Sequence, residues 1–139
     1  MKLKLKKTHK GLWLFGLSGS GKTFLSKKIF KSKKKSFLID GDVVRDLISF
    51  DLGYKKADRI KQNKRVLGIA KIVIKNGYYP IISSVYLDPK ISESAKKNGI
   101  KIINVVTTNK RVNKKLLNKK NIVGKSIKQP KINCEIINV

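Results

Sequence analysis

The sequence predicts an α/β fold of three layers, in which a parallel sheet of about five strands carries helices on both faces. Two observations support this prediction. Short apolar runs alternate along the chain with segments whose apolar residues recur at helical spacing, and this alternation is typical of parallel sheets. The chain has 139 residues, 40% of them hydrophobic, which is enough for one modest core. We therefore expect a single domain over residues 1–139.

The first half of the chain predicts strand, helix and strand in turn. Residues 12–15 are a short apolar run, and residues 24–30 carry apolar side chains at helical spacing. Residues 37–39 are apolar again and end at Asp40, while the polar residues 31–36 are expected to form a solvated connection. This order is a strand, a loop, a helix and a second strand.

A long helix is expected to dominate the second half. Residues 58–76 have apolar side chains at helical spacing, and Asn76 followed by Gly77 predicts a left-handed cap at the end. The remaining expected elements are a strand around residues 81–82, a short helix at 91–98, and strands at 102–106 and 135–139. With the first half, these make five strands.

The charge of the chain is unusual. Its 34 lysines and arginines against 8 acidic residues give a formal net charge of +26, which attracts nucleic acids, anionic lipids and anionic metabolites alike. The lysines are scattered through every segment, and asparagine and isoleucine are abundant, which favours a genome-wide codon bias over a dedicated nucleic-acid surface. The few arginines are then the informative cations, because a planar guanidinium grips phosphate or sulfate in a way that lysine cannot reproduce.

Several classes of protein are not expected. A single cysteine, Cys134, cannot form an internal disulfide, and a single histidine, His9, leaves no metal-ligand cluster. The apolar stretches are far shorter than the roughly 18 residues of a membrane span, and the basic first ten residues have no apolar region behind them. We expect a cytoplasmic protein without a membrane partner.

One glycine-rich stretch carries the clearest motif. Gly16, Gly21, Lys22 and Thr23 satisfy the pattern G-x-x-x-x-G-K-[ST] between a predicted strand and a predicted helix. The pattern indicates a P-loop and a P-loop NTPase-type fold, since glycines let backbone amides approach a phosphate chain at a helix N-terminus. Lys22 would reach the outer phosphates of ATP, and the Thr23 hydroxyl would ligate Mg²⁺. The expected ATP site comprises Ser18, Gly19, Ser20, Gly21, Lys22 and Thr23.

Two carboxylates follow the second predicted strand. Asp40 and Asp42 flank a glycine there, and Arg45 comes one helical turn later. Ligands of open parallel sheets bind at the carboxyl ends of the strands, so these groups should face the nucleotide. One carboxylate could accept the proton of an attacking hydroxyl while Arg45 steadies an anionic acceptor. The alternative, that the two aspartates merely cap the following helix, is equally open.

Four blocks of the sequence together resemble the adenylylsulfate kinases, which pass the γ-phosphate of ATP to the 3'-hydroxyl of adenosine 5'-phosphosulfate. The blocks are GLSGSGKT, DGDVVRDLISFDLGY, ADRIKQNKRV and NIVGKSIKQPKINCEIINV, and they follow one another in the family's order. The resemblance implies one ATP-dependent kinase domain over residues 1–139. It also implies small nucleotide substrates rather than nucleic acid, and a possible homodimer.

The resemblance also assigns roles to single residues. Asp42 becomes the catalytic base, Asp40 its neighbour near Mg²⁺, and Lys22 the third catalytic residue. Tyr54 replaces the family's phenylalanine and keeps an aromatic face for stacking on adenine. The residues that stand at the family's acceptor-pocket positions are Asp42, Arg45, Tyr54, Arg59, Gln62, Arg65, Val85, Tyr86, Val123 and Gly124.

The chain departs from the family pattern in three places. Gln62 stands where the family has asparagine, with Asn63 beside it, and Val85 and Tyr86 stand where isoleucine and serine are common. The family's lid is reduced to residues 109–121, a shortening expected to weaken the exclusion of water. The substitutes expected for the lid's K-G-L-Y run are Arg111, Lys114 and Lys115.

Three functions follow from these observations. The first is adenylylsulfate kinase, and the second is a related kinase for another anionic acceptor, such as cytidine diphosphoramidate. The third is a P-loop protein without catalysis that binds nucleotides or nucleic acid. Salt dependence separates the last from the others, because binding through many phosphates weakens steeply with salt.

Overall fold

The structure is a computed structural model that describes residues 6, 8–107 and 127–139. Its described residues contain a five-stranded sheet in which every pair of neighbouring strands is parallel, with the order β2-β3-β1-β4-β5. The predicted parallel sheet is therefore confirmed. The strands are β1 (Gly11–Phe15), β2 (Ser36–Asp40), β3 (Tyr79–Ser84), β4 (Ile100–Val106) and β5 (Glu135–Asn138).

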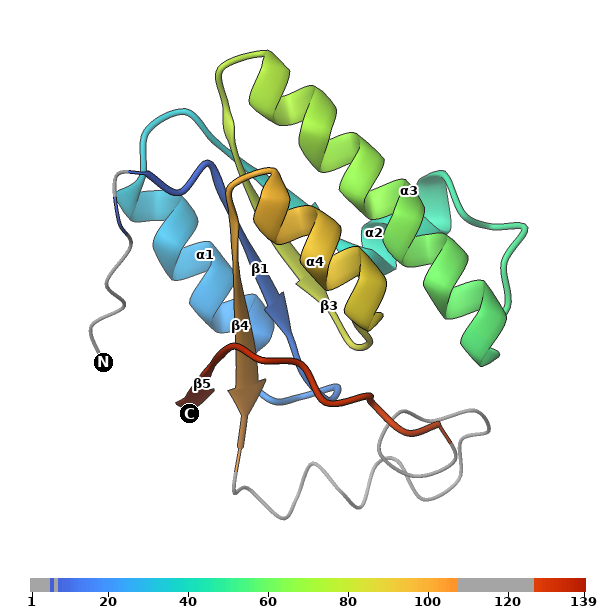
Figure 1. The fold of residues 1–139 in the computed structure, drawn as a ribbon. Coiled ribbons are helices and arrows are strands. Elements are labelled where there is room, and N and C mark those ends of the chain that lie inside the picture. The colour runs from blue at the N-terminus through green and yellow to red at the C-terminus, as the bar shows by residue number, and fades with distance from the viewer. Residues whose placement is uncertain (1–5, 7, 108–126) are drawn as a thin grey trace.

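Helices cover both faces of this sheet, as the sequence predicts (Figure 1). The helices are α1 (Lys22–Ser32), α2 (Gly41–Leu47), α3 (Lys56–Lys75) and α4 (Pro89–Lys97). Helix α1 packs on one face, while α3 and α4 lie side by side on the other. None of the helices described is long and apolar enough to cross a membrane.

The alternation of side chains along β1 explains the three layers. Trp13 and Phe15 point into the cluster beneath α3 and α4, whereas Leu12 and Leu14 point into the cluster beneath α1. All four side chains are almost fully buried. Because β1 is buried on both faces, its sequence is a continuous apolar run rather than an alternating one.

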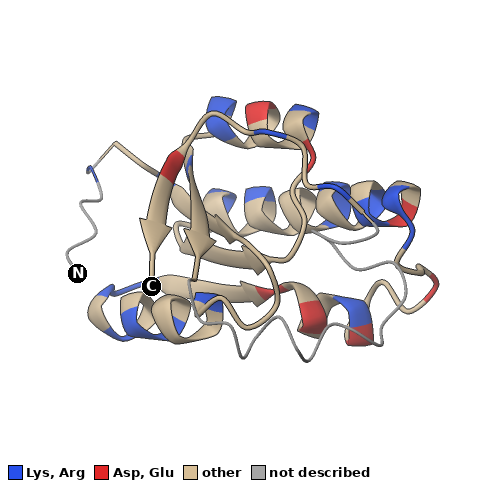
Figure 2. Ribbon diagram, turned by 90° about the horizontal axis from the view of Figure 1, so that it is seen from below, with Lys and Arg blue, Asp and Glu red and all other residues tan. Residues whose placement is uncertain are grey.

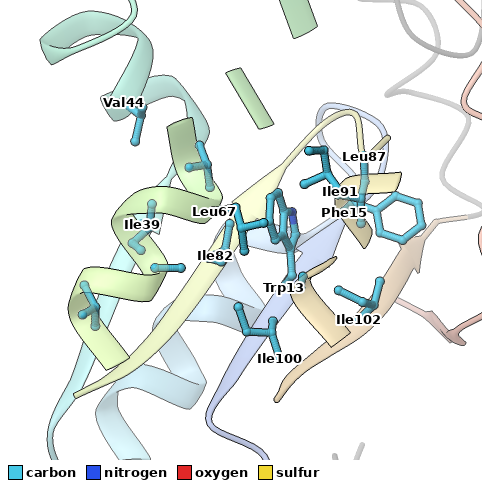
Figure 3. Close-up of a cluster of buried hydrophobic side chains, with 14 residues drawn as sticks. Trp13, Phe15, Ile39, Val44, Leu67, Ile82, Leu87, Ile91, Ile100 and Ile102 are labelled. Carbon is cyan, nitrogen blue, oxygen red and sulfur yellow. The ribbon is translucent and has the colours of Figure 1, made fainter. Parts of the chain in front are cut away.

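Trp13 lies at the centre of the larger cluster (Figure 3). Its ring is fully buried, and its indole N–H donates to the Ser84 hydroxyl at the end of β3, at 2.8 Å. A buried indole N–H is costly without a partner, so this bond satisfies the one polar atom of the ring. It also ties the carboxyl end of β3 to the core.

Most element boundaries differ from the sequence prediction by one or two residues; α1 and β2, for example, extend into residues 31–36, which were expected to form a solvated connection. Strand β3 begins at Tyr79, because Tyr79 and Pro80 pair with Ser36 and Phe37 of β2. Helix α3 begins at Lys56, two residues before the predicted start. Helix α2 is a separate short helix; the sequence suggested that it begins at the aspartates but did not predict where it ends. The extension of β3 arises from its pairing with β2, a contact between distant residues that no local pattern contains.

The topology places one crevice at the carboxyl edge of the sheet. From β1 the chain passes through α1 to β2, which lies on one side of β1 in the sheet. From β3 it passes through α4 to β4, which lies on the other side of β1. Strands that diverge in this way open a ligand-binding crevice beyond their carboxyl ends. The loops after β1, β2 and β3 therefore meet where the sequence predicts the site.

Candidate active site

The loop after β1 can carry only glycine at its first position. A Cβ atom on Gly16 would lie 2.1 Å from the carbonyl oxygen of Val105, which is impossible without moving the backbone of β4. Gly21, which precedes α1, has a φ of 100°, a left-handed conformation that favours glycine. The fold thus requires glycine at Gly16 for steric reasons and favours it at Gly21 for its backbone conformation.

The N-terminus of α1 is open in a way that the other short helices are not. Asp40 and Asp88 cap α2 and α4 through their side chains, whereas Gly21 provides no side-chain cap for α1. The first amides of a helix have no partner within the helix, and its dipole places partial positive charge there. This end of α1 can therefore receive the oxygens of a phosphate group.

Ser18, Ser20 and Thr23 lie around this helix end. Ser20 is buried, and its hydroxyl has no hydrogen-bond partner among the described residues. Thr23 is exposed in the first turn of α1, and Ser18 is exposed in the loop. Their hydroxyls are thus at the same end of the helix as the open amides.

Lys22 is the buried cation of the loop. Its side-chain ammonium donates to the carbonyl oxygens of Gly16, at 2.6 Å, and Leu17, at 2.9 Å. Burial lowers the pKa of Lys22 to about 8, while the negative charges of Asp42 and Asp40 act to raise it. The two carboxylates therefore act on the same site as Lys22, although they belong to another strand and helix.

The two aspartates have different environments. Asp40 ends β2, and its carboxylate accepts the backbone N–H of Asp42 at 2.9 Å, which is the capping contact considered from the sequence. Asp42 is exposed in the first turn of α2, and no described residue forms a hydrogen bond with its carboxylate. Asp42 thus keeps both carboxylate oxygens for a ligand, and Asp40 keeps one.

Two arginines surround one aromatic ring beside α2. The Arg45 guanidinium lies 4.4 Å from the centre of the Tyr54 ring and donates to the Gly53 carbonyl at 2.9 Å. Arg59 lies 5.5 Å from the same ring and donates to the Tyr54 carbonyl at 2.9 Å. Burial and the charge of Arg45 lower the pKa of Arg59. The structure thus brings together three of the residues expected to bind an anionic acceptor.

Arg65 lies elsewhere. Its guanidinium forms a two-point ion pair with Asp51, with N–O distances of 2.6 and 2.9 Å. The hydrogen bond from Arg65 lowers the pKa of Asp51 to about 2. The structure therefore does not group Arg65 with Arg45 and Arg59, and its expected contact with the acceptor stays a prediction.

Two adjacent amides of α3 bind different backbone segments. Gln62 is buried and donates to the carbonyl of Gly41, next to Asp42, at 3.1 Å. Asn63 is also buried; it donates to the Tyr86 carbonyl at 3.0 Å and accepts the Asp88 N–H at 2.8 Å. No separate role for Asn63 follows from the sequence. The sequence feature that could have pointed to Asn63 is an amide on the same face of α3 as the buried residues Val66, Leu67 and Ala70.

Tyr86 is buried after β3, next to the half-buried Val85. Its side chain is 2% exposed and packs in a small cluster with Ile127, Leu17 and Ile60. The Tyr86 hydroxyl has no hydrogen-bond partner among the described residues. Burial, followed by the charge of Asp88, raises the pKa of Tyr86, while the charge of Arg59 lowers it. Tyr86 is therefore close to both the P-loop and the arginine pair.

The remaining predicted positions cannot be placed. Val123, Gly124, Arg111, Lys114, Lys115 and the rest of the expected lid at 109–121 lie outside the described residues. Of the basic residues that can be placed, several lie on each of α1, α3 and α4, whereas α2 carries one, Arg45 (Figure 2). No described group of three or more His, Cys, Asp or Glu side chains could hold a metal ion.

Known proteins resemble this chain in sequence. The probable adenylyl-sulfate kinase of Pyrococcus abyssi is 36% identical over 90 residues, which cover 62% of this chain and 52% of that protein. The adenylyl-sulfate kinase of Clostridium acetobutylicum is 34% identical over 103 residues, which cover 71% of this chain and 50% of that protein. The chain thus spans about half the length of these relatives.

A solved structure shares the fold. The Mycobacterium tuberculosis APS kinase CysC in complex with AMPPNP and APS matches with a TM-score of 0.79 and 18% identity, over 94% of this chain and 88% of that one. At this identity the likeness concerns the fold alone. The sequence itself matches the family described as adenylylsulphate kinase over residues 8–124. This chain belongs to the adenylylsulphate kinase family.

Proposed function

We propose that this chain transfers the γ-phosphate of ATP to the 3'-hydroxyl of adenosine 5'-phosphosulfate. The observation that supports this most directly is the position of Asp42. Its charge acts on Lys22 of the P-loop, and its helix carries Arg45, which stacks on Tyr54 beside Arg59. A carboxylate between a phosphate-binding loop and a pair of arginines suits transfer from ATP to an anionic acceptor.

In this proposal the P-loop binds ATP through backbone and side chains together. Amides of residues 18–23 contact the phosphates, and Lys22 exchanges the carbonyls of Gly16 and Leu17 for phosphate oxygens. The Lys22 charge then stabilises the negative charge that develops during transfer. This assignment rests on the steric need for Gly16 and on the open end of α1.

Residues suited to Mg²⁺ are present on the same side. Magnesium prefers oxygen ligands and usually binds through one or two carboxylates together with substrate phosphates. Asp40 keeps one carboxylate oxygen beyond its capping bond, and Thr23 supplies an exposed hydroxyl. The ion, when bound, would neutralise charge on the β- and γ-phosphates.

The acceptor is held from α2, α3 and the loop after β3. Arg45 and Arg59 would contact its sulfate and phosphate oxygens, and Tyr54 would offer a stacking face for adenine. Asp42 would accept the proton of the 3'-hydroxyl as its oxygen attacks the γ-phosphorus and ADP leaves. The other residues proposed to line this side are Gln62, Arg65, Val85, Tyr86, Val123 and Gly124.

The burial of Tyr86 supports a second candidate for the acceptor. A buried tyrosine occupies more volume than the serine common in the family at this position, and a change in pocket shape alters which acceptor fits. A related kinase acting on another anionic nucleotide, such as cytidine diphosphoramidate, is therefore the alternative. In either case we propose a cytoplasmic enzyme that acts on small nucleotides, with a homodimer as a possible assembly.

The test is ATP turnover by the purified protein with Mg²⁺ and each acceptor separately. We expect ADP to form with adenosine 5'-phosphosulfate, and the Lys22→Ala variant to lose that activity. Turnover only with cytidine diphosphoramidate would replace the proposed acceptor by the alternative. Turnover with neither acceptor, combined with nucleic-acid binding that weakens steeply with salt, would contradict the kinase proposal.

A further inference from the structure

The loop after β3 is held by two amide side chains that come from distant parts of the chain. Asn63 of α3 donates to the carbonyl of Tyr86, at 3.0 Å, and accepts the N–H of Asp88, at 2.8 Å. Gln129, which precedes β5, accepts the N–H of Leu87, at 2.9 Å, and donates to its carbonyl, at 2.7 Å. We call these two residues the amide clasp. Each amide uses both its donor and its acceptor on the backbone of residues 86–88.

A third side chain ties the same loop to the core. The Ser84 hydroxyl donates to the Tyr86 carbonyl, at 2.9 Å, and accepts the indole N–H of Trp13, at 2.8 Å. The Tyr86 carbonyl therefore accepts two hydrogen bonds, one from Ser84 and one from Asn63. Because Trp13 is fully buried, this side of the loop is fixed to the centre of the sheet.

The residue fixed by these bonds is the one beside the proposed acceptor pocket. The side chain of Tyr86 packs against Leu17 of the P-loop and Ile60, the neighbour of Arg59 on α3. A tyrosine in a freely moving loop could turn away from both, whereas the clasp leaves the Tyr86 backbone little freedom. Its position relative to Arg59 thus depends on Asn63 and Gln129.

We propose that Asn63 and Gln129 are positioning residues for the acceptor, which act by holding residues 86–88 and thereby setting where Tyr86 lies beside Arg59. The inference rests on the proposed function, since it concerns the acceptor side of that site. Neither residue bonds to residues 18–23, and Leu17, against which Tyr86 packs, is not among the residues expected to bind ATP. The clasp should therefore affect acceptor binding and leave ATP binding unchanged. If Asn63 and Gln129 only stabilised the fold, their loss would not affect the binding of ATP and of the acceptor differently.

Steady-state kinetics of two clasp variants test this proposal. Asn63→Ala removes both clasp bonds from a buried residue. Gln129→Ala removes both clasp bonds, and a bond to the Pro130 carbonyl, from a half-buried residue, so it is the safer variant for folding. Because small displacements of positioning groups have large kinetic effects, we expect the KM for adenosine 5'-phosphosulfate to rise roughly tenfold in each variant. The KM for ATP should stay within about twofold of the wild-type value.

Asn76→Ala is the matched control. Asn76 also donates from its side-chain amide to a backbone carbonyl, that of Ile72 at 2.8 Å, but it lies just beyond the opposite end of α3 from the site. The control should leave both KM values unchanged. Its melting temperature, compared with those of the clasp variants, separates loss of stability from loss of acceptor binding.

The outcomes are distinct. A rise in the acceptor KM alone, in either clasp variant that folds, supports the proposal. An unchanged acceptor KM, or an equal rise in both KM values, would overturn it while the wild-type activity leaves the proposed function standing. A wild-type protein that turns over ATP with no adenosine 5'-phosphosulfate dependence would overturn the proposed function, and the inference with it.

Discussion

The two sides of the candidate site are built in different ways. The proposed ATP side, residues 16–23, is one continuous stretch in which backbone amides would be the main groups that bind the ligand. The acceptor side would be built by side chains from α2, α3, the segment between them and the loop after β3. Arg45, Arg59, Gln62 and Asn63 each donate to a backbone carbonyl outside their own helical turn. The first kind of site depends on glycines at fixed spacing, and the second depends on how separate elements pack.

The two sides also differ in how they carry positive charge. The ATP side has one cation, Lys22, which is buried and whose pKa falls to about 8. The acceptor side has Arg45 and Arg59, which share the ring of Tyr54 and remain charged because guanidinium has a very high pKa. A lysine can lose its proton near neutral pH when buried, whereas arginine cannot. Charge on the ATP side is therefore adjustable, and charge on the acceptor side is permanent.

The largest expected effect lies on the ATP side. Lys22→Met removes the buried charge and keeps a flexible chain of similar length, so it should lower kcat by about three orders of magnitude. Lys28→Ala, which removes an exposed lysine from the same helix, is the matched control and should leave kcat unchanged. A Lys22→Met variant with normal turnover would mean that the P-loop does not carry the chemistry.

The next effect concerns the carboxylate between the two sides. Asp42→Asn should lower kcat by roughly two to four orders of magnitude, as expected for loss of a general base, with little change in the KM for ATP. Asp46→Asn, four residues later on the same helix and exposed, is the control. Asp40→Asn separates the two predicted roles, since asparagine caps a helix about as well as aspartate. A greater loss of kcat in Asp40→Asn than in Asp42→Asn would reverse the assignment of the base.

The difference in construction explains what the sequence could predict. The P-loop, the alternation of strands and helices, and the parallel sheet follow from residue spacing within short windows. Gly16 and Lys22 could therefore be assigned to the P-loop from the local pattern alone. The roles of Asn63 and Gln129 depend on bonds between residues more than 20 positions apart, and no local pattern contains them. The ion pair of Arg65 with Asp51, 14 positions earlier, is likewise absent from any local pattern, and the contact of Arg65 with the acceptor stays a prediction.

A pH series should show the adjustable charge of Lys22. Below its pKa of about 8 the side chain is an ammonium that favours phosphate, and above that pKa it is increasingly neutral. Bound phosphate raises the pKa of Lys22, so the affinity for a non-hydrolysable ATP analogue should fall roughly tenfold from about pH 7.5 to about pH 9. Lys22→Met should bind more weakly and show no such fall. A wild-type affinity that is flat over this range would show that Lys22 is not the group that titrates.

The smallest expected effect is the difference in acceptor KM between variants of two arginines, Arg59 and Arg65. Arg59→Lys should raise the KM for adenosine 5'-phosphosulfate roughly tenfold, because an ammonium cannot reproduce the flat, two-point contact of a guanidinium with an anion. Arg65→Lys replaces an arginine whose guanidinium already binds Asp51, so it should change that KM less.

The comparison also tests how the acceptor side is assembled. Arg59 lies with Arg45 and Tyr54 in the structure, whereas Arg65 faces another loop through an exposed ion pair of the kind that contributes little to stability. Equal increases in KM for the two variants would mean that Arg65 leaves Asp51 when the acceptor binds. The acceptor would then draw a third arginine into the site, and the side-chain arrangement of the free protein would be only the starting point for binding.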